Sequence, residues 1–225
     1  MIPLRDNIPS QKKPIVTTII LSINILVFFY QLSLGADFEG FILKYGAIPD
    51  QIMHGERVTP YSTFPFTLTL FTAMFLHGGL WHLLGNMLYL WIFGDNIEER
   101  LGHLRFLILY IVSGLAASFA HIFMSPNSQL PMVGASGAIA GILGAYMIEF
   151  PYAKILTLVF FGFFIRVVSI PAFFVLGFWF ILQLIYASTT LGVSGGGGIA
   201  WFAHIGGFLA GIILFRLLRK RSHWI

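Results

Sequence analysis

Long apolar runs without charge restrict the possible folds of this chain more than any other feature of its sequence. The first run, residues 15–32, follows a segment that contains Arg5, Lys12 and Lys13. As a helix, at about 1.5 Å per residue, it nearly crosses the roughly 30 Å hydrocarbon core of a bilayer. A secretory signal peptide is the alternative, but the apolar part of such a peptide is only about 7–15 residues long. We therefore expect a retained membrane span.

Five further runs favour membrane helices; they cover residues 80–93, 104–124, 136–150, 172–187 and 199–218. The composition agrees, because 57% of the 225 residues are hydrophobic and only 10% are charged. In soluble domains, about 45–50% of the residues are hydrophobic and about 25% are charged. The sequence thus predicts an all-α membrane protein, a six-helix bundle that forms one polytopic domain over residues 1–225. A long loop is expected at 35–70 and a charged turn at 94–100.

An even number of spans places both termini on one side of the membrane. Basic residues gather on that side, and only Lys44 and Arg57 fall on the other. The positive-inside rule therefore predicts cytoplasmic termini, provided that residues 156–165 form an interfacial loop or hairpin and not a seventh span. The same bias accounts for the sequence pI of about 9.5. The lipid bilayer is thus an expected partner and nucleic acid is not.

Ser136 lies beside Gly137 at the predicted start of the fourth span, after a loop with Pro126 and Pro131. At the beginning of a helix, unpaired backbone N–H groups and the positive end of the helix dipole surround such a hydroxyl. This setting suits a hydroxyl that becomes an alkoxide. It also suits an ordinary helix cap, since serine is a preferred capping residue. The stretch alone leaves both interpretations open.

His204 is a polar residue within the last predicted span, where ionisable groups are candidates for function. Gly207 and Gly211 lie on roughly the same helix face, and the fourth span has Gly137 and Gly141 in the same spacing. Helices lined by small residues approach closely. Close approach would bring the imidazole within reach of the Ser136 hydroxyl, as a serine nucleophile and its base require. A structural histidine bonded between helices is the alternative.

His82 and Asn86 are four residues apart in the second span and share one helix face. Together with the backbone N–H of Ser136 they could donate hydrogen bonds to a developing oxyanion. Their alternative role is hydrogen bonding between helices. The chain has no cysteine and no His-Glu-x-x-His pattern, so we expect no metal and no cofactor. No carboxylate lies near these residues within a span, which favours a Ser-His dyad over a triad.

These motifs resemble those of the rhomboid intramembrane serine proteases, over about residues 70–215. The resemblance is carried by Gly134-x-Ser136-Gly137, Ala203-His204-x2-Gly207-x3-Gly211, His77-x4-His82-x3-Asn86 and Glu98-x-Arg100-Leu101-Gly102. It implies that Ser136 is the nucleophile and His204 the general base and acid. It also implies an oxyanion hole of His82, Asn86 and the Ser136 amide. The implied reaction is hydrolysis of a peptide bond in or next to the transmembrane helix of a membrane-protein substrate, through an acyl-enzyme.

The chain departs from the family pattern at two places. Ala140 occupies the position where some relatives have an aromatic residue that stacks on the histidine, and the first loop lacks the family's Trp-Arg pair. A non-catalytic rhomboid-like binder of membrane proteins and a small transporter or channel are the competing hypotheses. The glycine run 195–198 is expected to be either a cap over the site or a plain linker. The expected location is a plasma membrane, as a multi-pass protein of a bacterium.

Overall fold

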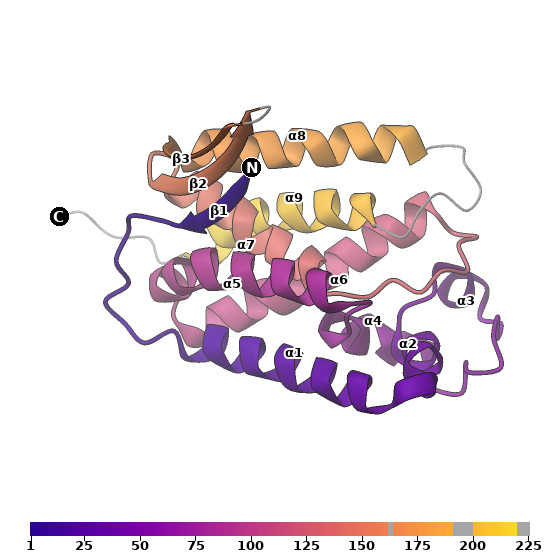
Figure 1. The fold of residues 1–225 in the computed structure, drawn as a ribbon. Coiled ribbons are helices and arrows are strands. Elements are labelled where there is room, and N and C mark those ends of the chain that lie inside the picture. Colours follow the sequence, from indigo (N-terminus) through magenta and orange to yellow (C-terminus); the bar gives the residue numbers. More distant parts are fainter. Residues whose placement is uncertain (162–163, 191–199, 220–225) are drawn as a thin grey trace.

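The computed structural model describes residues 1–161, 164–190 and 200–219 and is mostly helical (Figure 1). Helix α8 runs along one edge of the bundle and α1 along the opposite edge, with the other long helices between them (Figure 1). Each predicted span corresponds to one helix of the structure. These helices are α1 (Ile15–Ser33), α5 (Leu80–Leu101), α6 (His103–Met124), α7 (Ser136–Glu149), α8 (Ala172–Thr190) and α9 (Trp201–Leu218).

The lengths of these helices agree with a membrane protein. Among the described residues, α1, α6, α8 and α9 are each long and apolar enough to cross a bilayer. A fifth span arises if α5 is counted together with the short segment Phe66–Phe75 before it, to which it is bent by 76°. Helix α7 has only 14 residues, or about 21 Å of length. The predicted start of the last span at Ile199 and the glycine run 195–198 lie outside the described residues.

Two segments predicted to be irregular are helical instead. The expected loop at 35–70 contains a 3-10 turn and three short helices: η1 (Gly35–Asp37), α2 (Phe38–Tyr45), α3 (Pro49–His54) and the start of α4 (Phe66–Thr72), which leads into η2 (Ala73–Phe75). The expected charged turn at 94–100 is the last part of α5, where Asn96 and Glu98 are buried. Asn96 bonds to Asp6, and Glu98 bonds to the start of α1. Because these partners are distant in the sequence, the charged residues alone wrongly indicated an exposed turn.

A small sheet corrects the all-α prediction. Strands β1 (Ile2–Arg5), β2 (Lys154–Phe161) and β3 (Phe164–Pro171) form an antiparallel sheet in the order β1-β2-β3. The β2–β3 pair is the hairpin alternative foreseen for this region, and its register aligns Lys154 with Pro171. Ile155 and Thr157 of β2 are fully buried. Strands β2 and β3 form because β-branched and aromatic residues dominate them and because one face of β2 packs on the protein.

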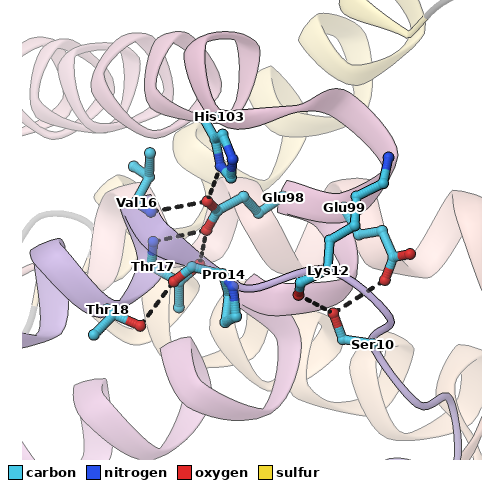
Figure 2. Close-up of polar contacts among 9 residues, drawn as sticks. All are labelled: Ser10, Lys12, Pro14, Val16, Thr17, Thr18, Glu98, Glu99 and His103. Atoms are coloured by element: carbon cyan, nitrogen blue, oxygen red, sulfur yellow. Dashed lines mark hydrogen bonds and ion pairs between the residues drawn. The ribbon is translucent and has the colours of Figure 1, made fainter.

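Glu98 anchors the start of α1 (Figure 2). Its carboxylate accepts hydrogen bonds from the backbone N–H groups of Val16 and Thr17, over 2.8 and 2.7 Å, and from the Thr17 hydroxyl over 2.7 Å. Its other contact is with His103 Nδ1, at 2.6 Å. The first N–H groups of a helix have no partner within the helix, and the positive helix end attracts an anion. Glu98 therefore joins α1 to the turn between α5 and α6.

Helix α7 lies at the centre of the bundle, with residues 137–146 all buried. Its glycines face those of α9 at very short range. A β-carbon added at Gly207 would clash with the carbonyl oxygen of Gly137, and one at Gly211 with that of Gly141. Only glycine permits so close an approach of two backbones. This contact fixes the position of the α7 start relative to the first turn of α9.

Candidate active site

Ser136 and His204 are in direct contact. Ser136 is the first residue of α7 and His204 lies in the first turn of α9. The Ser136 Oγ atom lies 2.9 Å from His204 Nε2. The close packing of the two helices thus brings together two residues that are 68 positions apart in the sequence.

The backbone before Ser136 determines how α7 begins. Ala135 precedes α7 as the cap residue, and no side chain makes a capping bond at this helix end. The Ser136 hydroxyl therefore does not act as the helix cap, which was one of the two interpretations. Gly134 has φ of +121°, a region that favours glycine. Its N–H donates to the carbonyl of Ala73 over 2.8 Å, which ties this loop to η2.

His204 has a second polar partner that sequence reasoning missed. Its Nδ1 atom lies 2.8 Å from Oε1 of Gln183, which is on α8. The rings of Trp179 and Trp201 border the imidazole, with centroids 5.8 and 6.1 Å from it. Ala140, where some relatives have an aromatic residue, is fully buried. A signal for Gln183 exists in the sequence, since one amide in the middle of an apolar span is a functional candidate.

His82 and Asn86 line the same cavity as Ser136 and His204. A β-carbon added at Gly134 would lie 2.7 Å from His82 Nε2 and 3.5 Å from Asn86 Nδ2, so both side chains adjoin the loop that leads to Ser136. The structure therefore gathers all four predicted residues at one place. Their roles in an oxyanion hole remain a prediction.

His77 is a further residue beside Asn86, and the sequence analysis assigned no role to it. It is fully buried, and its Nε2 accepts a hydrogen bond of 2.9 Å from the Asn86 amide. Its backbone N–H and C=O each bond to the Gln31 side chain, over 3.1 Å. These contacts fix the Asn86 amide and connect the site to α1.

The cavity has a volume of about 860 Å³, within the roughly 300–1,000 Å³ of ligand sites. Its walls come from α5, α6, α7, α8, α9 and the loop before α7. Among residues 1–161, 164–190 and 200–219, no three His, Asp or Glu side chains are grouped so that they could hold a metal ion. An alcohol paired with an imidazole at such a cavity can carry out acyl transfer.

Comparisons with known proteins identify the relatives of this chain. The Rhomboid domain family matches residues 66–221. The chain is 32% identical over 151 residues to "Rhomboid protein 1, mitochondrial" of Saccharomyces cerevisiae, covering 65% of this chain and 40% of that protein. It is 33% identical over 159 residues to "RHOMBOID-like protein 4" of Arabidopsis thaliana, covering 69% and 35%.

A third relative is named as a protease. The chain is 34% identical over 137 residues to "Rhomboid protease GluP" of Bacillus subtilis, covering 60% of this chain and 24% of that protein. The chain thus spans less than half the length of these three relatives.

Proposed function

We propose that this chain, which belongs to the rhomboid family, is an intramembrane serine endopeptidase that acts through a dyad of Ser136 and His204. Its substrates would be membrane proteins, cleaved in or next to a transmembrane helix. The observation that carries this proposal is the 2.9 Å contact between Ser136 Oγ and His204 Nε2 at the edge of a large cavity. The family supports the same function, since it includes a relative named as a protease.

In the first half of the reaction, His204 Nε2 takes the proton from Ser136 Oγ as the oxygen attacks the peptide carbonyl carbon. The tetrahedral intermediate carries a negative oxygen, to which His82, Asn86 and the Ser136 N–H would donate. An amide group has two N–H donors, and His77 takes one of those of Asn86. The other is left for the oxyanion. Collapse breaks the C–N bond, and His204 gives its proton to the leaving amine.

The second half hydrolyses the ester that joins the substrate acyl group to Ser136. Water attacks the ester carbonyl, and His204 now takes the proton of the water. The second tetrahedral intermediate uses the same three donors. When it collapses, the C–O bond to Ser136 breaks and the proton returns to Oγ. A new carboxylic acid end is released and the dyad is restored.

Six spans in a single polytopic domain form the proposed topology, with α7 as a short fourth span and α5 as the second. Both ends of the chain would face the cytoplasm. Contacts support a common end for the two termini: the Lys154 N–H donates to Asn7 Oδ1 over 2.7 Å, and Arg219 lies 3.8 Å from Glu149. The basic residues of this end would then follow the positive-inside rule.

The chain is a membrane protein, and we propose the plasma membrane of a bacterium as its location. The relative from Bacillus subtilis supports this choice, although another relative is named as mitochondrial. The proposed partners are transmembrane substrates and the bilayer, with no nucleic acid, metal or cofactor.

The test is cleavage of a single-span reporter protein by the purified chain in proteoliposomes. We expect Ser136→Ala and His204→Ala each to lower kcat/KM by at least ~10³-fold, because each removes the dyad. Ser22→Ala is the matched control: the Ser22 hydroxyl donates within α1, to the Thr18 carbonyl, and is remote from the site. Cleavage by Ser136→Ala at the rate of the parent would overturn the proposal.

A non-catalytic rhomboid-like binder is the alternative, and a fluorophosphonate probe separates it from an enzyme. The probe forms a covalent bond with an activated serine. Labelling of the parent but not of Ser136→Ala supports the protease. Absence of labelling in lipid, with substrate still bound, supports the binder.

A further inference from the structure

We propose that Gln183 is a positioning residue, which fixes the tautomer and the orientation of His204 so that Nε2 accepts the proton of Ser136. The inference rests on the proposed function and adds a third member to the dyad, supplied by α8. Gln183 acts through the histidine and does not touch the reacting atoms.

The hydrogen bonds of Gln183 determine which way its amide faces. Its Nε2 donates to the carbonyl oxygen of Trp179, one turn earlier in α8, over 3.0 Å. Its Oε1 lies 2.8 Å from His204 Nδ1. In the reverse orientation, the amide oxygen would face the carbonyl oxygen of Trp179, and two acceptors would oppose each other. The oxygen of Gln183 is therefore the group that His204 meets.

The amide oxygen in turn determines where the histidine carries its proton. An oxygen acceptor beside Nδ1 requires that Nδ1 be protonated and donate. In the neutral imidazole, Nε2 then has its lone pair free. That lone pair points at Ser136 Oγ, 2.9 Å away, which is the arrangement a general base needs. The three hydrogen bonds thus run in one direction. The Ser136 hydroxyl donates to His204, the His204 ring donates to Gln183, and the Gln183 amide donates to the Trp179 carbonyl.

Among residues 1–161, 164–190 and 200–219, Gln183 is the side chain that meets His204 Nδ1. Among the described residues, no Asp or Glu hydrogen-bonds to His204. The titratable side chains that face it are His82 from α5 and His121 from α6, while α7 supplies Ser136 and α8 supplies Gln183. The Trp179 and Trp201 rings border the imidazole but present no acceptor to Nδ1. Gln183 is 4% exposed, so little of its surface is open to water that could compete for its bond to the ring.

A purely structural role, in which Gln183 only joins α8 to α9, predicts a different outcome from a positioning role. The measurement is the rate of fluorophosphonate labelling of Ser136 as a function of pH, in proteoliposomes, together with kcat and KM on the reporter. Gln183→Met keeps a similar volume and removes the acceptor. We expect it to lower the labelling rate and kcat by roughly 10–100-fold, as the loss of such an outer partner does, with little change in KM.

Gln183→Glu keeps an oxygen beside Nδ1 and adds a negative charge. We expect its labelling rate above neutral pH to stay within about tenfold of the parent, because the acceptor is retained. Labelling requires the neutral imidazole, and a nearby carboxylate favours the protonated one. The pH at which labelling falls to half on the acidic side should therefore move upward.

Asn24→Leu is the matched control. Asn24 is also a fully buried amide, and its Nδ2 donates to the carbonyl of Ile20, one turn earlier in α1, over 2.8 Å. Loss of the Asn24 amide should lower the thermal stability, as loss of the Gln183 amide does, but it should leave the labelling rate unchanged. If Gln183→Met labels like Asn24→Leu at every pH, Gln183 is structural only.

The outcomes for the function and for the positioning role are separable. If the parent protein is not labelled and does not cleave, the proposed function fails. If the parent is active and Gln183→Met equals it, only the positioning role fails. Should Gln183→Met not fold, ¹⁵N NMR of histidine-labelled parent protein gives an independent test. Protonated Nδ1 on neutral His204 is expected, and protonated Nε2 would overturn the inference.

Discussion

At the scale of single residues, Glu98 shows how one buried charge can join three helices. Its side chain is 1% exposed, and isolated carboxylates at such depth are costly. Here two backbone N–H groups, one hydroxyl and one imidazole nitrogen surround it (Figure 2). These groups belong to α1 and to the first turn of α6, while Glu98 itself is in α5. The charge is thus the means by which the start of α1 is held in place.

Glu98→Gln should destabilise the protein. The amide puts an NH2 group where the carboxylate accepted two bonds, so at least one donor of α1 loses its partner. Breaking a buried charge-assisted bond costs about 1–3 kcal/mol for each group left unpaired. The unfolding free energy in mild detergent should fall by about that amount. Glu99→Gln is the control: Glu99 accepts from Ser10 Oγ and the Gln11 N–H at the protein surface. An equal loss in both variants would contradict the special role of Glu98.

The sequence indicates the spatial neighbours of some of these residues but not of others. Ser136 and His204 could be placed in contact because each carries glycines at helix spacing on its own span. Gln183 could not be placed beside His204, since nothing in the order of residues indicates how α8 is rotated. Glu98 was read as part of a charged turn for a related reason. Its partners Val16 and Thr17 are more than 80 positions away, beyond the reach of local pattern.

At the scale of elements, the long apolar helices were the predictable part of the fold, and the short helices α2, α3 and α4 and the strands were not. The helix α6 (His103–Met124) matches its predicted span to within one residue, because long apolar runs end where charge or proline interrupts them. The β2–β3 hairpin was one of two alternatives for its region. Pairing of β1 with β2 joins residues about 150 positions apart, and four residues at the N-terminus carry no periodic signal of their own.

The contact between α7 and α9 should be intolerant of a single methyl group. Gly207→Ala and Gly211→Ala would each push a β-carbon into a carbonyl oxygen of α7. The helices must separate, and the gap between Ser136 and His204 widens. Misplacement by about 1 Å can cost about 10²-fold in rate. Fluorophosphonate labelling should therefore fall in both variants by about that factor.

The matched control for the glycine variants is Gly177→Ala in α8, where an added β-carbon has open space within 4 Å. Alanine is the better helix former by about 0.8–1.0 kcal/mol, so this variant should be as stable as the parent or more so, with unchanged labelling. Labelling of Gly207→Ala at the parental rate would show that the two helices can adjust without moving the dyad apart.

At the scale of the whole molecule, the two ends of α7 differ in charge and in chemistry. Before its start lies the uncharged loop of residues 125–134, beside Ser136 and His204. After its end lie the sheet, Arg100 bonded to Glu149, and the last described residue, Arg219. Hydrolysis needs water, and the cavity lies at the uncharged end. If the basic end faces the cytoplasm, the dyad opens toward the opposite side of the membrane.

This orientation can be tested with single cysteines, because the natural chain has none. Leu130 and Tyr152 flank α7 and are 51% and 86% exposed. An impermeant maleimide should label Leu130→Cys in intact spheroplasts and Tyr152→Cys only after permeabilisation, because the basic side is retained in the cytoplasm. Both variants should still cleave the reporter, which shows that the fold is kept. The reverse pattern would mean an inverted protein, and labelling of both from outside would mean that α7 does not cross the membrane.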